Sequence, residues 1–181
     1  MQSDLQDETL APWFAAPKPY KDSRALIRKA LGFPNERRPL LIGIDGLDGA
    51  GKTSLAAWLS WQLEMPAVHL DLYIIRDSEP LQYRLEDLAE TLDARAVLKQ
   101  PVIVEGILLL RVLGQIDRRP DFLVFVQRAS HQSSLRSLMQ SYLNEHQPRS
   151  KADKVVKWSS TTRDRRMALA HQHRNHLERS T

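Results

Sequence analysis

A glycine-rich segment that ends in a lysine and a hydroxyl residue is the part of this sequence most suited to chemistry. Residues 46 to 53 read GLDGAGKT and satisfy the pattern G-x-x-x-x-G-K-[ST], whose backbone N–H groups enclose a phosphate group. Gly46, Gly49 and Gly51 permit the close approach and the positive φ angles that side chains would obstruct. The segment therefore predicts a binding site for a polyphosphate.

Polar side chains in the same segment can serve a nucleotide and its metal ion. Lys52 can bridge the β- and γ-phosphates, Thr53 can offer its hydroxyl to Mg²⁺, and Ser54 adds a donor. We expect ATP and Mg²⁺ to bind here. The predicted binding residues are Gly46, Asp48, Gly49, Ala50, Gly51, Lys52, Thr53 and Ser54. A chance match is the alternative, and it is disfavoured because a strand pattern precedes the turn and a helix pattern follows it.

Alternating strand and helix patterns surround this turn. The apolar run at 40 to 44 predicts a strand buried on both faces, and apolar residues at helical spacing between 55 and 63 predict a helix after the turn. The other expected elements are strands at 67 to 70, 102 to 104 and 121 to 126, a helix that begins near Ser78 and Pro80, and a short helix or turn at 107 to 113. This alternation predicts an α/β fold of three layers, with a mostly parallel sheet flanked by helices.

The N-terminal part of the chain differs from this pattern. Residues 1 to 20 contain three prolines and are expected to form an irregular leader, and Asp22 and Ser23 are expected to cap a helix that ends at Leu31. The polar, acidic start lacks the pattern of a secretory signal. We therefore expect a cytoplasmic protein that does not enter a membrane.

The C-terminal part is predicted to be mainly helical. A helix is expected at 135 to 143, Pro148 interrupts it, and 150 to 178 have a largely helical pattern. We find no fifth strand in the sequence. The predicted organisation is a leader and helix at 1 to 38, followed by one domain at 39 to 181 whose C-terminal part is helical and basic.

Composition narrows the possible functions. The 181 residues fit one domain, and the absence of cysteine excludes disulfides, thiolate metal sites and a cysteine nucleophile. Residues 146 to 181 hold nine Lys or Arg against three Asp or Glu, so this tail can bind nucleic acid, gather arginines around a triphosphate or form a solvated helix. His171, His173 and His176 do not share one helix face, which disfavours a zinc site.

Three segments together resemble the uridine kinase and phosphoribulokinase group of P-loop kinases. They read RPLLIGIDGLDGAGKTSLA, HLDLY and VIVEGILLL, and the resemblance covers residues 38 to 128. It implies a P-loop NTPase fold, a catalytic base at the end of the second strand, here Asp71, and a Glu-Gly pair after the third strand, here at Glu105. The chain lacks the group's R-x-x-R-D-x-x-x-R-G lid pattern.

Carboxylates at strand ends also suit phosphoryl transfer on chemical grounds. The acceptor hydroxyl must lose a proton, and Asp71 is expected at the ligand edge of the sheet, where it could accept that proton. Glu105 is expected to hold Mg²⁺ through water, or to orient the acceptor. The alternatives are a turn-capping role for Asp71 and a structural role for Glu105. Asp45, just before the turn, could contact a metal-bound water or be structural.

Arginines could stabilise the charge of the transferring phosphate. Arg128, predicted to follow the fourth strand, and Arg136 lie where the resemblance implies nucleotide-contacting and lid arginines. Arg128 is the catalytic candidate beside Lys52 and Asp71, and Arg136 is a candidate for the lid. Substitutes for the lid are Arg149, Arg163, Arg165 and Arg166. The predicted acceptor site consists of Asp71, Tyr73, Arg76, Arg84 and Glu105. Arg76 and Arg84 would suit an acceptor that carries phosphate or carboxylate, but they could also form ion pairs with Glu79, Glu86 or Asp87.

The function that we predict is transfer of the γ-phosphate of ATP to a hydroxyl of a small metabolite, such as a nucleoside, a sugar or a vitamin-like compound. The sequence has no N-K-x-D motif, and no D-x-x-G motif follows the third predicted strand, so a GTPase switch is disfavoured. The partner that we expect is a small-molecule acceptor rather than nucleic acid, and a homodimer is compatible with these features. The alternative is a nucleotide-binding regulatory or RNA-associated module without kinase activity.

Overall fold

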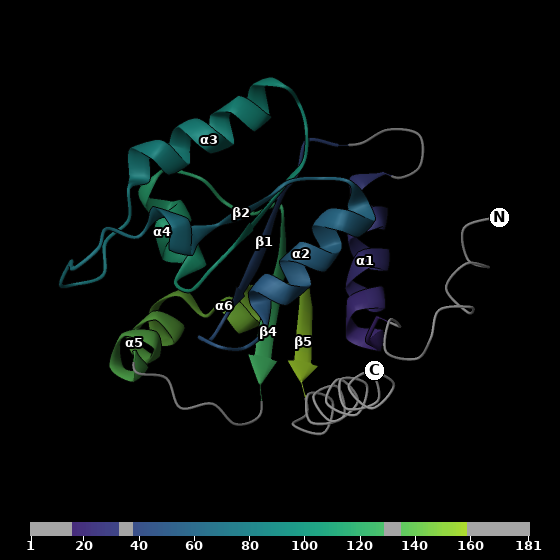
Figure 1. Cartoon of the computed structure of the whole chain (residues 1–181). Helices are drawn as coiled ribbons and strands as arrows, with labels where there is room; N and C mark the ends of the chain where they lie inside the picture. The colour runs from purple at the N-terminus through teal and green to yellow at the C-terminus, as the bar shows by residue number, and fades with distance from the viewer. Residues whose placement is uncertain (1–15, 33–37, 129–134, 159–181) are drawn as a thin grey trace, which may run out of the picture.

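Five parallel strands form the centre of the molecule. The computed structural model describes residues 16 to 32, 38 to 128 and 135 to 158. The strands are β1 (Leu41–Gly46), β2 (Ala67–His69), β3 (Val102–Glu105), β4 (Phe122–Arg128) and β5 (Lys154–Trp158), in the order β2-β3-β1-β4-β5. All four pairings are parallel, so every carboxyl end lies at one edge of the sheet. The predicted α/β fold with a parallel sheet is confirmed (Figure 1).

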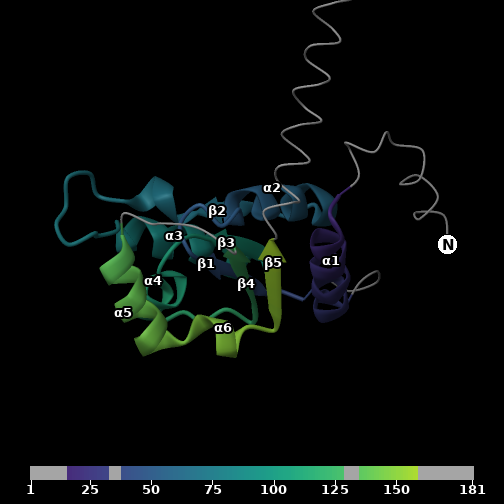
Figure 2. The same cartoon turned by 90° about the horizontal axis from the view of Figure 1, so that it is seen from below.

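Helices cover both faces of this sheet (Figure 2). On one face, α1 (Lys18–Leu31) and α2 (Lys52–Leu63) pack in a common apolar cluster with β1 and β4. On the other face, α3 (Leu85–Val97), α4 (Leu109–Gln115) and α5 (Arg136–His146) form a second cluster. The short helix α6 (Pro148–Lys151) precedes β5, and a 3-10 helix, η1 (Leu70–Tyr73), follows β2.

Strand β1 shows how one strand serves both faces. Ile42 and Ile44 are fully buried against the α1 and α2 cluster, whereas Gly43 faces α4. A Cβ atom on Gly43 would lie 2.8 Å from Leu109 Cδ2, so the close packing of α4 on the sheet depends on this glycine. Asp45, the next residue on the α4 side, is a fully buried carboxylate where an apolar side chain would be usual.

The fifth strand corrects the sequence-based prediction. Residues 154 to 158 (KVVKW) pair with β4 as an edge strand, whereas a helix was expected there. Val156 is fully buried, but Lys154 and Lys157 flank the two valines and weaken the apolar signal of so short a segment. The rest of the predicted helical region, residues 159 to 178, lies outside the described residues.

Helix α3 begins later than the sequence pattern indicated. It starts at Leu85 rather than near Ser78 and Pro80. The preceding segment folds back on itself through an antiparallel bridge between Ile74 and Tyr83. Ser78 Oγ donates to the Ile75 carbonyl at 2.8 Å and accepts from the Gln82 N–H at 3.0 Å, so this serine closes a turn instead of capping a helix.

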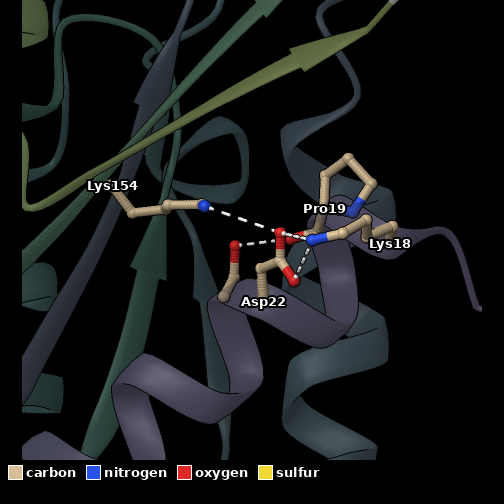
Figure 3. Close-up of polar contacts among 5 residues, drawn as sticks. Lys18, Pro19, Asp22 and Lys154 are labelled. Carbon is tan, nitrogen blue, oxygen red and sulfur yellow. Dashed lines mark hydrogen bonds and ion pairs between the residues drawn. The ribbon is translucent and has the colours of Figure 1, made fainter.

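Helix α1 begins at Lys18, within the segment predicted to be an irregular leader, and Asp22 and Ser23 are not its caps. Asp22 instead binds Lys18 Nζ at 2.8 Å, and its Oδ2 lies 3.8 Å from Lys154 Nζ of β5 (Figure 3). The hydrogen bond from Lys18 lowers the pKa of Asp22. Ser23 Oγ donates to the Pro19 carbonyl at 2.8 Å. These contacts connect α1 to the edge strand, and α1 shares its apolar cluster with the sheet.

The described ranges contain no helix that is both long and apolar enough to cross a lipid bilayer.

Candidate nucleotide and acceptor site

The glycine-rich turn connects the end of β1 to the start of α2. The backbone φ angles of Gly46, Gly49 and Gly51 are 150°, 64° and 94°, and residues with a side chain rarely adopt such values. A Cβ atom on Gly46 would lie 2.2 Å from the carbonyl oxygen of Val126, so the turn passes directly against β4. No side chain caps the N-terminus of α2, whose first N–H groups follow Gly51. This is the strand, turn and helix arrangement that encloses a phosphate group.

Lys52 is the cationic centre of the turn. Its side chain is 7% exposed, and its Nζ donates to the Leu47 carbonyl at 2.9 Å. Burial lowers the pKa of Lys52, while the surrounding carboxylates oppose that shift. Those carboxylates belong to Glu105, Asp45, Asp48 and Asp71. The Lys52 ammonium group lies in the turn itself, where it can also neutralise the charge of a phosphate group that binds there.

Thr53 and Glu105 meet at the carboxyl edge of the sheet. Thr53 Oγ1 donates to Glu105 Oε1 at 3.0 Å, and the carboxylate is 3% exposed. A hydroxyl and a carboxylate are the hard oxygen ligands that Mg²⁺ prefers, and Mg²⁺ keeps several waters and phosphate oxygens as its other ligands. The two residues predicted to hold the metal ion therefore lie together and fit it chemically. Within the described ranges, no group of three or more His, Cys, Asp or Glu side chains is arranged so that it could hold a metal ion by itself.

His69 is a residue of this site that the sequence-based reasoning did not assign. It ends β2, directly beside Glu105 in the β2 and β3 register, and its Nδ1 lies 2.8 Å from Glu105 Oε1. One carboxylate oxygen thus has both Thr53 and His69 as neighbours. The signal in the sequence was the position of His69 at a strand end, two residues before Asp71. The three C-terminal histidines lie outside the described residues.

Asp71 lies on η1 and lines a hollow of about 520 Å³. The other lining residues are Leu72, Ile74, Ile75, Arg76 and Arg84. Asp71 is exposed, and it acts electrostatically on Lys52 and on Tyr83. Asp71 therefore belongs to the lining of the hollow, and its charge also acts on the lysine of the phosphate-binding turn.

The other predicted acceptor residues are placed differently. The Tyr73 hydroxyl shares a hydrogen bond of 3.0 Å with Thr91 of α3, and Tyr73 does not line the hollow. Arg84 donates to the Leu72 carbonyl at 2.6 Å, and its Nε lies 3.1 Å from Asp87 Oδ2, one of the ion pairs expected from the sequence. Arg76 is exposed at the rim of the hollow. The structure thus brings Asp71, Arg76 and Arg84 together and turns Tyr73 toward α3.

The candidate arginines of the lid are only partly described. Arg128 is half-buried and ends β4, at the same sheet edge as Glu105 and His69. Arg136 begins α5, and Arg149 lies on α6. Arg163, Arg165 and Arg166 lie outside the described residues.

A buried tyrosine contacts the residue just before the turn, and the sequence placed it only within the helix expected at 135 to 143. Tyr142 of α5 is fully buried, and its hydroxyl donates to Asp45 Oδ2. Asp45 Oδ1 accepts from the Gly46 N–H at 2.7 Å. Burial raises the pKa of Asp45 to about 6, although these hydrogen bonds and the charge of Lys52 act in the opposite direction. Asp45 thus bonds to the turn itself, as a structural role would require.

Comparisons with known proteins found similar solved structures, whereas no family model and no curated protein matches the sequence. A possible uridine kinase from Bacillus stearothermophilus is 19% identical, with a TM-score of 0.48, over 75% of this chain and 98% of that chain. A gluconokinase from Sinorhizobium meliloti 1021 is 18% identical, with a TM-score of 0.39, over 80% and 100%. A shikimate kinase from Bacteroides thetaiotaomicron is 15% identical, with a TM-score of 0.33, over 64% and 84%. At such values, the case for a function rests on the residues of the site itself.

Proposed function

We propose that this protein is a Mg²⁺-dependent kinase that transfers the γ-phosphate of ATP to a hydroxyl of a small metabolite. The observation that carries the proposal is the meeting of Thr53 and Glu105, 3.0 Å apart, beside a turn whose lysine lies among carboxylates. A turn that only binds phosphate needs no carboxylate beside its threonine hydroxyl. A turn that presents a metal-bound triphosphate for transfer needs such a carboxylate to help hold the metal ion.

In this proposal, the turn holds the triphosphate. Backbone N–H groups of residues 46 to 53 surround the phosphates, and Lys52 exchanges its contact with the Leu47 carbonyl for contacts with the β- and γ-phosphates. Thr53 and Glu105 would hold Mg²⁺, which neutralises phosphate charge when it is bound. Asp48, Ala50 and Ser54 complete the nucleotide-binding residues. Arg128, at the end of β4, would stabilise charge on the group in transfer.

The hollow beside η1 would hold the acceptor. The acceptor oxygen attacks the γ-phosphorus, its proton passes to the Asp71 carboxylate, and the bond between the γ-phosphorus and the bridging oxygen of ADP breaks. Two observations support this role: Asp71 lines this hollow, and its charge acts on Lys52. Arg76, at the rim, would contact the acceptor, whereas the contacts of Arg84 with Leu72 and Asp87 favour a structural role for that arginine. Cytoplasmic location stays a prediction from the sequence.

Acceptor-dependent release of ADP tests this proposal. The protein is incubated with Mg-ATP and a panel of nucleosides, sugars, vitamins and their monophosphates. Lys52→Ala should abolish turnover, and Asp71→Asn should lower kcat at least about 100-fold because the proton acceptor is lost. Asp77→Asn is the matched control, since Asp77 is an exposed aspartate of the same segment that does not line the hollow.

Two outcomes would contradict the assignment at different points. Equal turnover by the Asp71→Asn variant and the wild type would remove Asp71 from the mechanism. Binding of Mg-ATP without turnover on any acceptor of the panel would instead indicate the alternative, a nucleotide-binding regulatory module.

A further inference from the structure

A buried contact between Tyr142 and Asp45 connects helix α5 to the base of the phosphate-binding turn. Both side chains are 0% exposed, and the Tyr142 hydroxyl donates to Asp45 Oδ2. The two residues are 97 positions apart in the chain, and neither belongs to the glycine-rich pattern. A buried carboxylate needs such partners because burial without them is costly. This contact therefore fixes the position of α5 relative to the end of β1.

The Tyr142 hydroxyl has a second hydrogen-bond partner, which further restricts the position of the hydroxyl. It accepts from the Leu110 N–H at 3.0 Å in the first turn of α4. The Arg111 guanidinium lies 5.8 Å from the centre of the Tyr142 ring, and the His146 ring lies 5.1 Å from it. One oxygen atom thus joins α4, α5 and β1. A hydroxyl that both donates and accepts inside the protein has little freedom to move.

Asp45 extends this connection to the turn. Its Oδ1 accepts from the Gly46 N–H at 2.7 Å, at the point where β1 becomes the turn. Gly46 itself is confined by β4, because a Cβ atom there would lie 2.2 Å from the Val126 carbonyl oxygen. The next residue, Leu47, accepts from Lys52 Nζ at 2.9 Å. A series of hydrogen bonds and covalent steps therefore leads from Tyr142 through Asp45 to the lysine of the turn.

We propose that Tyr142 is a positioning residue of the nucleotide site, which acts by holding Asp45 and thereby the first residues of the phosphate-binding turn. This inference rests on the proposed function, since it takes a nucleotide to be the ligand of the turn. Without the hydroxyl, Asp45 keeps only the backbone N–H groups of Gly46 and Leu109 as hydrogen-bond donors, and the start of the turn can adopt more conformations. Backbone N–H groups that are less well ordered before binding give a weaker complex.

The test compares two tyrosine variants in direct binding of Mg-ADP by calorimetry. Tyr142→Phe keeps the buried ring and removes the hydroxyl, and we expect the Kd for Mg-ADP to rise about tenfold, as loss of a hydrogen bond to a charged group would produce. Tyr83→Phe is the matched control. Tyr83 is also buried in the second apolar cluster, and its hydroxyl donates at 3.5 Å to the Ile107 carbonyl, which is not part of the turn. Its Kd should stay within about twofold of the wild-type value.

A double-mutant cycle separates positioning from general stability. Asp45→Asn and the double variant Asp45→Asn, Tyr142→Phe are measured in the same way, together with urea unfolding of all four proteins. If the two residues act as one unit, the double variant binds Mg-ADP about as weakly as the weaker single variant. If the Kd of the double variant instead rises by the product of the two single-variant factors, Tyr142 does not act through Asp45. A lower stability with an unchanged Kd also overturns the inference.

The remaining outcomes are equally decisive. Should Tyr142→Phe fail to fold, Asp45→Asn tests the same bond from its other end, and a Kd equal to that of the wild type would overturn the inference. Failure of both variants to fold would show a contact required for the fold rather than for positioning. If wild-type protein does not bind Mg-ADP, the proposed function fails, whereas binding by the wild type with equal binding by Tyr142→Phe contradicts only the role of Tyr142.

Discussion

Thr53 and Glu105 are 52 residues apart in the chain, and the threonine hydroxyl donates to the glutamate carboxylate at 3.0 Å. Parallel pairing of β1 with β3 produces this contact, because it aligns Ile44 with Glu105 and brings the end of β3 beside the start of α2. Each residue came from a different segment of the sequence. Their meeting at one sheet edge is the geometric basis of the proposed metal site.

Replacing this carboxylate should weaken the response to magnesium. Glu105→Gln keeps an acceptor oxygen for Thr53 and removes the charge, so we expect the Mg²⁺ concentration at half-maximal activity to rise about tenfold or more. Titration of MgCl₂ at saturating ATP measures this. Glu86→Gln in α3, an exposed position, should leave the titration unchanged. Equal curves for Glu105→Gln and the wild type would remove Glu105 from the metal site.

His69 should act on the metal site through Glu105. Its Nδ1 lies 2.8 Å from the same carboxylate oxygen that contacts Thr53. Partners of a metal-binding carboxylate typically change metal affinity by about 10-fold to 100-fold when they are removed. We expect His69→Ala to raise the Mg²⁺ requirement by about tenfold, with a smaller effect on the Kd for ADP measured without metal. A change of both quantities by the same factor would instead indicate a general disturbance of the site.

Alanine substitutions at Gly46 and Gly114 test how closely the turn approaches β4, because the first position is confined and the second is open. An added Cβ at Gly46 would meet the Val126 carbonyl oxygen at 2.2 Å, whereas nothing lies within 4 Å of one at Gly114 in α4. We expect Gly46→Ala to lose roughly 2 kcal/mol or more of unfolding free energy and to abolish nucleotide binding. Gly114→Ala should gain about 0.5 kcal/mol, because alanine favours a helix. Urea unfolding of both variants checks this, and similar effects at the two positions would contradict the close approach of the turn to β4.

Sequence patterns predicted the parts of the fold whose signals are local. The run before the turn predicted β1, and the turn and the helix after it follow from the glycine and lysine spacing. The edge strand β5 was missed because Lys154 and Lys157 surround its valines. The start of α3 was misplaced because Ser78 can cap a helix or close a turn, and the pairing of Ile74 with Tyr83 decides between them.

Some positions in the candidate site were predictable in the same way, whereas the roles of its residues stay predictions. Glu105 ends β3 directly after an apolar run, and Asp71 lies on η1, two residues after the end of β2. The orientation of Tyr73 toward Thr91 and the bond from Tyr142 to Asp45 depend on how distant helices pack on the sheet. Such contacts join segments up to 97 residues apart, and no spacing within either segment encodes them.

The buried carboxylate of Asp45 should give the protein a distinctive dependence of stability on pH. Burial raises the pKa of Asp45 from 3.8 to about 6, so the folded state binds this proton more tightly than the unfolded state does. The stability that Asp45 contributes is therefore complete below about pH 4 and is lost as the pH rises through about 6. With about 1.4 kcal/mol for each pKa unit, the loss is roughly 3 kcal/mol.

Comparison with a variant that is neutral at position 45 isolates the contribution of Asp45 ionisation to the unfolding free energy. Asp45→Asn has no proton to bind at this position, so the difference in unfolding free energy between wild type and variant should shift by roughly 3 kcal/mol in favour of the variant from pH 4 to pH 7. Urea unfolding at four pH values in that range measures the difference, and contributions from other carboxylates cancel between the two proteins. Asp77→Asn, at an exposed position, is measured in parallel as the control for loss of one negative charge. Parallel pH curves for wild type and Asp45→Asn would mean that the carboxylate is ionised as readily as in water, and that its bonds to Tyr142 and Gly46 offset the whole cost of its burial.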